Sequence, residues 1–157
     1  MSWACAPAPS SVRLPGAVEI ARSHVPSSVR VQVRDGGALV VREVPLEEYV
    51  AATMLSEVHP DAGDDAIAER IFEVQAIIAR TYAVSSVGRH AKDGFDLCST
   101  THCQLYEPAR VKTSRWAAAA EDAAKRTAGE LLWYGNAPAL ALFHADCGGH
   151  TSNASAV

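Results

Sequence analysis

Two neighbouring segments with helical spacing constrain the fold of this chain more than any other feature of its sequence. In the first, residues 46–58, one side of the predicted helix carries Leu46, Tyr49, Val50, Thr53 and Met54. Pro45 suits the first turn of a helix, and His59-Pro60 ends the pattern. In the second, residues 65–87, the predicted inward face consists of Ile67, Ile71, Val74, Gln75, Ile78 and Tyr82. Amphipathic helices so close in sequence must bury these faces against each other or against a sheet.

β-Structure is predicted on both sides of these helices. Residues 29–33 alternate valine with polar side chains and lead through Asp35-Gly36-Gly37 to an apolar run, which is the pattern of a β-hairpin. Downstream of the helices, the sequence predicts a third helix at about 113–128 and two strands at 131–134 and 139–143. The expected fold class is therefore α+β, a single domain in which helices pack with antiparallel β-hairpins.

The expected domain occupies residues 29–157. Residues 1–28 are rich in proline and show no sustained periodicity, so they are predicted to form an irregular lead-in. The chain ends shortly after Cys147-Gly148-Gly149-His150-Thr151, with no evident closing element. We therefore expect the domain to be incomplete at its C-terminus.

Composition excludes several classes of function. The 157 residues are 48% hydrophobic and carry a formal net charge of -4, and no basic run exceeds two residues. A nucleic-acid partner is therefore not expected, because such proteins carry a basic patch or stripe. No apolar stretch approaches the ~18 residues of a membrane-spanning helix, and no signal peptide is visible at the start of the chain.

Glu57 is the first candidate for chemistry. Continuing the stripe of the first helix by three or four positions reaches this carboxylate where an apolar side chain is expected. A carboxyl on such a face loses hydration, which raises its pKa towards the range of a general acid. The alternative is a glutamate at a helix end that extends to water or pairs with an arginine.

The second helix offers Gln75, Arg80 and Tyr82. Gln75 and Tyr82 share a face and could hydrogen-bond a sugar or the carboxyl of Glu57, whereas Arg80 projects about 140° away from Gln75. A buried amide and phenol that bond only to the protein backbone would explain Gln75 and Tyr82 equally well.

Cys98, His102 and Cys103 supply two thiolates and an imidazole within six residues, a donor set that suits zinc. We favour His90 as the fourth ligand, because a short local tether costs less loop-closure entropy than recruiting a distant residue. His144, Cys147 and His150 are the other candidates for that position. The alternatives to a metal are a reduced cysteine pair or a Cys98–Cys103 disulfide.

The segment from Phe143 to Thr151 follows a predicted strand and contains His144 and the pair Gly148-Gly149. Adjacent glycines allow a backbone to approach a ligand closely, although a tight turn requires them as well. We therefore include His144, Gly148 and Gly149 among the candidate substrate-binding residues.

Several of these segments together resemble the stage II sporulation protein D family, also called SpoIID/LytB. The resemblance rests on VPLEEY at 44–49, Glu57, QAIIARTYA at 75–83, GFDLCSTTHCQLY at 94–106 and FHADCGGHT at 143–151. It runs in order from about residue 40 to the end of the chain.

The resemblance implies a peptidoglycan lytic transglycosylase that cuts glycan strands lacking stem peptides, with Glu57 as the catalytic glutamate. It also implies structural zinc on Cys98, His102 and Cys103, with His90 the preferred fourth ligand, and a place in the cell envelope or outside the cell. Gln75, Arg80, Tyr82, His144, Gly148 and Gly149 are then the substrate-binding candidates. The expected partners are peptidoglycan glycan strands and a cell-wall amidase, which relatives are described as enhancing.

One carboxyl suffices for that reaction, because the attacking C6 hydroxyl belongs to the same N-acetylmuramic acid whose bond is cut. Two other classes stay open at this point. The chain could be a non-catalytic wall-binding module or amidase enhancer, or a zinc hydrolase whose Cys/His site is catalytic.

Overall fold

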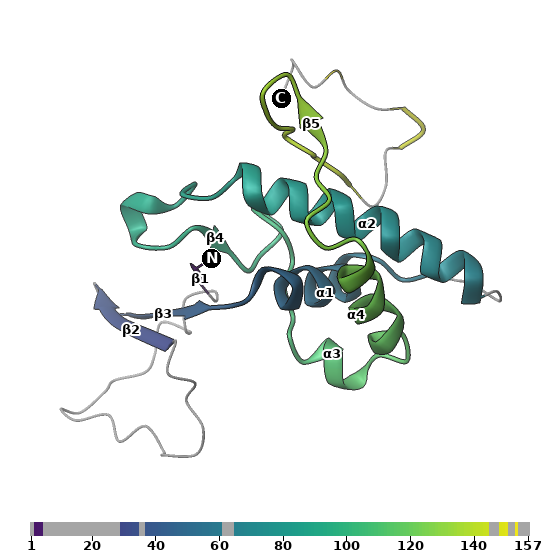
Figure 1. The fold of residues 1–157 in the computed structure, drawn as a ribbon. Coiled ribbons are helices and arrows are strands. Elements are labelled where there is room, and N and C mark those ends of the chain that lie inside the picture. Colours follow the sequence, from purple (N-terminus) through teal and green to yellow (C-terminus); the bar gives the residue numbers. More distant parts are fainter. Residues whose placement is uncertain are drawn as a thin grey trace.

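The computed structural model describes residues 2–4, 29–34, 37–60, 65–144, 148–150 and 153 of the 157. Within them the chain forms an α+β domain, as predicted, with its helices gathered on one side and a small sheet on the other (Figure 1). Most of the predicted lead-in, residues 5–28, lies outside this description.

Helix α1, Leu46–Glu57, is the centre of the helical layer. Its packing neighbours are α2, Asp65–Ser85, and α4, Ala117–Arg126, with the short α3, Arg110–Thr113, on a further side (Figure 1). Both ends of α1 lie within one residue of the prediction. The sequence predicted one buried stripe along α1, but every residue from Tyr49 to Ser56 is buried, because neighbours cover the helix on all sides.

The predicted face of α2 was wrong for most of its length. The helix buries Ala68, Phe72, Ala76, Ala79 and Ala83, whereas Ile67 and Val74 are more than half exposed. The small alanine side chains let α1 and α4 pack close to α2, because the distance between two helices depends on side-chain size at their contact. Tyr82 does face the core, at 4% exposure.

The main sheet has the strand order β2-β3-β1-β4, with β2 at Val29–Arg34, β3 at Gly37–Glu43, β1 at Ser2–Ala4 and β4 at Leu97–Cys98. The predicted hairpin is confirmed by β2 and β3, whose antiparallel register closes with Arg34 opposite Gly37. Strand β1 was not predicted; it pairs antiparallel with β3 and parallel with β4. Through β1, the sheet reaches the loop that carries Cys98.

The C-terminal strands form a separate hairpin of β5, Trp133–Tyr134, and β6, Ala137–Pro138. Strand β5 is shorter than the strand predicted at 131–134, and the strand predicted at 139–143 was wrong. The chain turns directly at Gly135, whose φ is +59°, so Ala137 and Pro138 already pair with β5. The third helix, predicted at about 113–128, corresponds to α4 and begins later, at Ala117. Extended backbone at Ser114 and a turn at 115–116 separate it from α3, which was not predicted.

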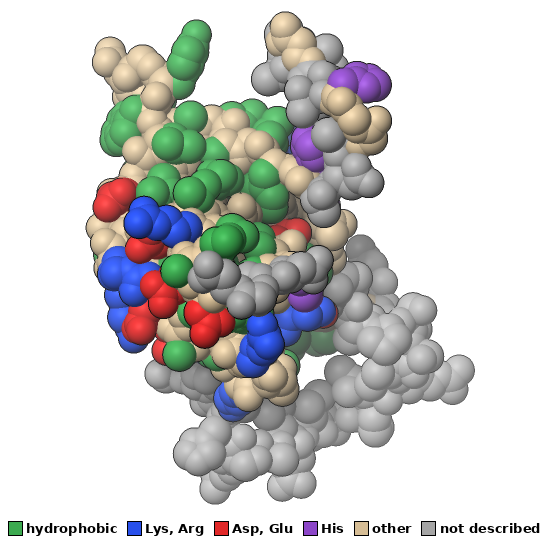
Figure 2. Space-filling view, turned by 90° about the vertical axis from the view of Figure 1, so that its right-hand side faces the viewer, with side chains coloured by type: hydrophobic (Ala, Val, Ile, Leu, Met, Phe, Trp, Pro, Cys, Tyr) green, Lys and Arg blue, Asp and Glu red, His purple; other side chains and the backbone are tan. Residues whose placement is uncertain are grey.

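On the face shown in Figure 2, hydrophobic side chains gather in the upper part, and charged side chains of both signs intermix below them. No helix in the described ranges is long and apolar enough to span a membrane.

Candidate active site and metal cluster

One cleft brings together residues from four parts of the chain. It has a volume of about 360 Å³. Its lining comprises Glu57, Tyr82, Arg89, Thr101, His102, Cys103, Leu142, Phe143 and His144. The predicted catalytic glutamate and two of the predicted metal ligands thus line the same cleft, although they are far apart in sequence.

Glu57 is the last residue of α1, where the helix emerges from the core. The backbone becomes extended at Val58, and the side chain of Glu57 is half-buried. Its Oε1 accepts a hydrogen bond from the backbone N–H of Leu105, at 2.6 Å. The carboxyl is therefore held by the main chain on one side and lines the cleft on the other.

Residues 104–107 make several further hydrogen bonds and ring contacts with α1. The hydroxyl of Tyr49 donates a 2.6 Å hydrogen bond to Oε1 of Gln104, and both side chains are almost completely buried. The ring of Tyr106 stacks on that of Tyr49, with centroids 5.6 Å apart. The backbone N–H of Glu107 donates to the hydroxyl of Ser56 at 3.0 Å. These contacts fix the peptide that holds Glu57.

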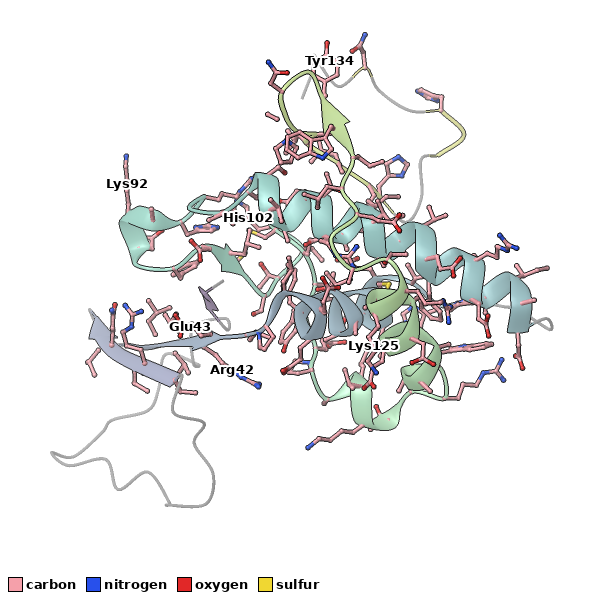
Figure 3. All side chains as sticks on the ribbon, viewed as in Figure 1. Arg42, Glu43, Lys92, His102, Lys125 and Tyr134 are labelled. Carbon is pink, nitrogen blue, oxygen red and sulfur yellow. The ribbon has the colours of Figure 1, made fainter. Side chains whose placement is uncertain are left out.

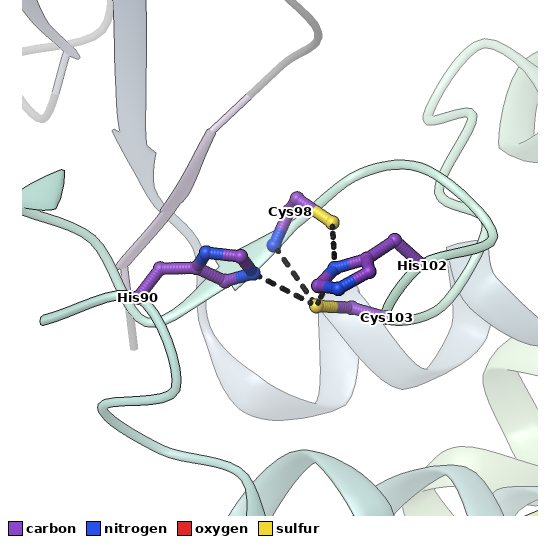
Figure 4. Close-up of side chains that lie close together, drawn as sticks. All are labelled: His90, Cys98, His102 and Cys103. Atoms are coloured by element: carbon purple, nitrogen blue, oxygen red, sulfur yellow. Dashed lines mark hydrogen bonds between the residues drawn. The ribbon is translucent and has the colours of Figure 1, made fainter.

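Four side chains converge immediately before this segment, as Figure 4 shows: His90, Cys98, His102 and Cys103. Their donor atoms all lie within 4.8 Å of one another. Sγ of Cys103 is 3.4 Å from Nε2 of His90 and 3.7 Å from Nδ1 of His102, and Sγ of Cys98 is 3.6 Å from Nδ1 of His102. The predicted cluster, including His90, is present.

The loop that begins after α2 folds back to place His90 in the cluster. The backbone N–H of His90 donates to the carbonyl of Asp96, and the ring stacks on Phe95 with centroids 4.7 Å apart. Nδ1 lies 3.5 Å from a carboxylate oxygen of Asp93, so Nε2 faces the thiols. Such a carboxylate orients a metal-binding histidine. In Figure 3, Lys92 points outwards at the tip of this loop while His102 lies inwards.

Cys98 and Cys103 are free thiols, not a disulfide. Burial acts to raise the pKa of each thiol, but the net shifts of the two differ. At Cys98 the hydrogen bonds from Thr100, followed by those from Cys103 and His102, outweigh burial and lower the pKa, whereas the pKa of Cys103 stays raised. The backbone N–H of Cys98 also donates to Sγ of Cys103 at 3.5 Å, a contact that supports a thiolate ligand.

The donor spacing fits a tetrahedral ion. Metal–sulfur and metal–nitrogen bonds of about 2.3 and 2.05 Å, at a tetrahedral angle, separate sulfur from nitrogen by about 3.6 Å. The observed sulfur–nitrogen distances of 3.4, 3.6 and 3.7 Å match that separation. The residues present therefore suit a four-coordinate metal with two thiolate and two imidazole ligands.

The family model for SpoIID, described as stage II sporulation protein, matches residues 34–134. This chain belongs to the SpoIID family. The match includes strands β3 and β4, helices α1 to α4 and all four residues of the His/Cys cluster.

The SpoIID chain also has curated relatives. It is 31% identical over 127 residues to stage II sporulation protein D of Bacillus subtilis, covering 74% of this chain and 36% of that protein. It is 34% identical over 120 residues to an uncharacterized protein of Brachyspira hyodysenteriae, covering 76% of this chain and 30% of that protein. The chain thus spans about a third of the length of these relatives. No solved structure matches it.

Four of the six predicted substrate-binding residues of this SpoIID chain, Gln75, Arg80, Gly148 and Gly149, are not among the described residues that line the cleft. Arg80 is 1% exposed, and its guanidinium bonds both carboxylate oxygens of Glu47 and the carbonyl of Ala124. Gln75 lies beside a shallow hollow formed by α2, with its amide nitrogen buried and unpaired within the described structure. Arg80 therefore joins α1, α2 and α4 instead of facing the cleft.

Tyr82 and His144 do line the cleft, Tyr82 from α2 and His144 from the segment after β6. Gly148 and Gly149 have φ angles of +60° and +99° and form an exposed turn, and neither is among the described cleft-lining residues. Cys147, one of the alternative fourth ligands, lies outside the described residues.

The sequence did not point to Arg89, Thr101, Leu142 or Phe143 as cleft residues. Thr101 precedes the predicted ligand His102, and Phe143 precedes His144. Their places in the cleft could therefore have been inferred from these neighbours. Arg89 follows a glycine in a loop without periodicity, which carries no signal of its own.

Proposed function

We propose that this SpoIID chain cleaves peptidoglycan glycan strands by a lytic transglycosylase mechanism, leaving 1,6-anhydro-N-acetylmuramic acid ends. Because its substrate is the cell wall, the proposal places its action in the cell envelope or outside the cell. The stage II sporulation protein D relatives support a role connected with sporulation.

The observation that carries this proposal is the single carboxylate of the cleft. Among the described residues that line it, Glu57 alone carries a carboxyl group. Glycosidases that use water or an enzyme nucleophile need a second carboxylate, about 5 to 9.5 Å from the first. A lytic transglycosylase uses the C6 hydroxyl of the same sugar and needs one group that donates and then accepts a proton.

Glu57 would perform both proton transfers. Its carboxyl protonates the glycosidic O4 of the departing N-acetylglucosamine as the bond from C1 of N-acetylmuramic acid to O4 breaks. The resulting carboxylate takes the proton from the C6 hydroxyl as O6 bonds to C1. The products are an anhydro end and a free O4 hydroxyl, and Glu57 is protonated again. The N–H of Leu105 orients the carboxyl through both transfers.

The residues around Glu57 suit a sugar substrate. Burial raises the pKa of Tyr82, so its phenol stays protonated and can donate a hydrogen bond to a sugar oxygen. Leu142 and Phe143 add apolar surface against which a sugar ring can pack, and His144 can donate or accept a hydrogen bond.

We also propose that the metal is zinc and that it is structural. Zinc favours sulfur and nitrogen donors in tetrahedral geometry, and His90, Cys98, His102 and Cys103 supply four. When bound, zinc would cross-link the loop, because four protein ligands leave no position for water. Since Cys103 precedes Gln104 directly, that cross-link would support the peptide that holds Glu57.

Purified peptide-free glycan strands test the function. The parent chain should release products one water lighter than hydrolysis products, identified by mass spectrometry as 1,6-anhydro ends. Glu57→Ala should release none. Glu130→Gln is the matched control, since this exposed glutamate is not among the residues that line the cleft.

The remaining outcomes separate the rival classes. Hydrolysis products that disappear when zinc is chelated would replace the proposal with a zinc hydrolase. Binding of glycan without cleavage by the parent would replace it with a wall-binding module, and stimulation of a cell-wall amidase by that inactive chain would identify an amidase enhancer.

A further inference from the structure

Arg89 is the only lysine or arginine among the described residues that line the cleft. It follows Gly88, whose φ is +80° and whose N–H donates to the side chain of Asp96 at 3.1 Å. The backbone N–H of Arg89 donates to the carbonyl of Ser86. The main chain that carries Arg89 is therefore fixed beside the cleft that contains Glu57.

The charge of Arg89 has no carboxylate partner in the described part of the chain. Four other arginines do have such partners: Arg42 pairs with Glu48, Arg80 with Glu47, Arg110 with Glu107 and Arg126 with Glu73. The side chain of Arg89 is exposed, so its charge is available to a ligand in the cleft.

Arg89 and Tyr82 line the same cleft, and the charge of Arg89 acts on the Tyr82 hydroxyl. Burial raises the pKa of Tyr82, and the positive charge of Arg89 acts in the opposite direction. The guanidinium is therefore within electrostatic reach of the Tyr82 hydroxyl, which lines the same cleft. An anionic group bound near Glu57 and Tyr82 would meet this cation.

We propose that Arg89 binds the lactyl carboxylate of N-acetylmuramic acid in the substrate. This proposal rests on the function proposed above. In a glycan strand without stem peptides, the lactyl group ends in a free carboxylate. Where a stem peptide is attached, that carboxyl is an uncharged amide. A planar guanidinium forms paired, charge-assisted hydrogen bonds with a carboxylate and loses them with an amide. Arg89 would thereby select strands whose muramic acid is anionic.

The test measures binding in a Glu57→Gln background, in which turnover does not complicate the measurement. The probes are peptide-free glycan oligosaccharides and the same oligosaccharides with the lactyl carboxylates reduced to alcohols. The Glu57→Gln protein should bind the carboxylate form about tenfold more tightly than the alcohol form. Adding Arg89→Gln should abolish that preference. Arg89→Lys should retain part of it, because the charge remains but the paired geometry is lost.

Arg70→Gln is the control, since Arg70 is an exposed arginine of α2 outside the described cleft lining. It should keep the full preference for the carboxylate form. An unchanged preference in Arg89→Gln, or an equal loss in Arg70→Gln, would overturn the proposal.

Steady-state kinetics with otherwise wild-type protein separate this proposal from the proposed function. Arg89→Gln should raise KM for peptide-free strands about tenfold with little change in kcat, because the carboxylate takes no part in the bond changes and is bound equally in the ground and transition states. If the parent releases no anhydro ends but binding still depends on Arg89 and the carboxylate, the catalytic proposal fails and this one stands. If the parent cleaves and no dependence is measured, only this proposal fails.

Discussion

The two ends of α1 each carry a glutamate, and the structure engages them in opposite ways. Glu47, in the first turn, receives two hydrogen bonds from the buried guanidinium of Arg80, at 3.0 and 2.5 Å. Glu57, in the last turn, accepts a single backbone hydrogen bond and borders an open cleft. The same residue type is thus neutralised by a cation at one end and left available for chemistry at the other.

This difference separates a carboxylate that is paired within the fold from one that borders the cleft. Arg80 also donates to the carbonyls of Ala124 and Glu130, so its pair with Glu47 ties the start of α1 to the C-terminal end of α4. Glu57 lacks such a cation and is held by the main chain alone in the contacts that the structure describes. Substitutions at the two ends should therefore affect different properties.

The largest effect is expected for Glu57→Gln, which preserves size but removes the acid. Turnover of peptide-free glycan should fall by about 10² to 10⁴, the usual contribution of general acid–base catalysis. Urea denaturation should show nearly the parent free energy of unfolding, because the amide can still accept the N–H of Leu105. Comparable turnover in parent and variant would remove Glu57 from the mechanism.

Glu47→Gln should show the opposite pattern. It leaves the guanidinium of Arg80, which is 1% exposed, without its counter-charge. Breaking a buried ion pair by removing one partner costs about 3 to 5 kcal/mol. Because Glu47 is partly exposed, the expected loss is about 3 kcal/mol, at the lower end of that range. Urea denaturation measures this loss, while kcat per folded molecule should be retained. A parent-like stability with impaired turnover would reverse the roles assigned to the two glutamates.

Metal removal tests how the Glu57 end is supported. Elemental analysis should give one zinc per chain, and a free metal concentration 100 times the Kd should stabilise the fold by about 2.7 kcal/mol. Chelation, or Cys98→Ser with Cys103→Ser, should lower the Tm accordingly. Lys92→Ala, which changes the exposed tip of the same loop, is the control. A metal-free chain with the parent Tm would exclude a structural metal.

The smallest effect is expected for Tyr49→Phe, which removes the hydroxyl that bonds Gln104. Leaving a buried amide oxygen unpaired should cost about 1 to 2 kcal/mol. Amide hydrogen exchange should increase at Leu105, the residue whose N–H holds Glu57. Tyr134→Phe, at a position 86% exposed, should change neither quantity. Unaltered exchange at Leu105 would show that Tyr49 does not support the Glu57 contact.

The metal cluster was predictable because most of its determinants are local. Cys98, His102 and Cys103 are close in sequence, and His90 belongs to the same loop, so a short closure brings them together. The position of Glu57 at the end of a helix was also predictable, from the apolar spacing and His59-Pro60. Its catalytic role stays a prediction.

The buried face of α2 was not predictable from hydrophobicity. Ile67, Ile71 and Val74 form the more apolar stripe, yet the smaller Ala68 and Ala76 are buried. The choice depends on how closely α1 and α4 approach, and that distance is a property of the assembled helices. A scale of side-chain hydrophobicity contains no information about it.

The sequence by itself determined the two long helices and the β2–β3 hairpin, the clustering of cysteine and histidine in one loop and the glutamate at the end of α1. Each follows from spacing within a short stretch. Only the tertiary structure decided three contacts: Arg80 pairs with Glu47, the N–H of Leu105 donates to the carboxylate of Glu57, and Arg89 borders the cleft. These contacts join residues far apart in the chain, and no local pattern specifies them. They form when α1 is enclosed by its neighbours and the metal-cluster loop closes against its end.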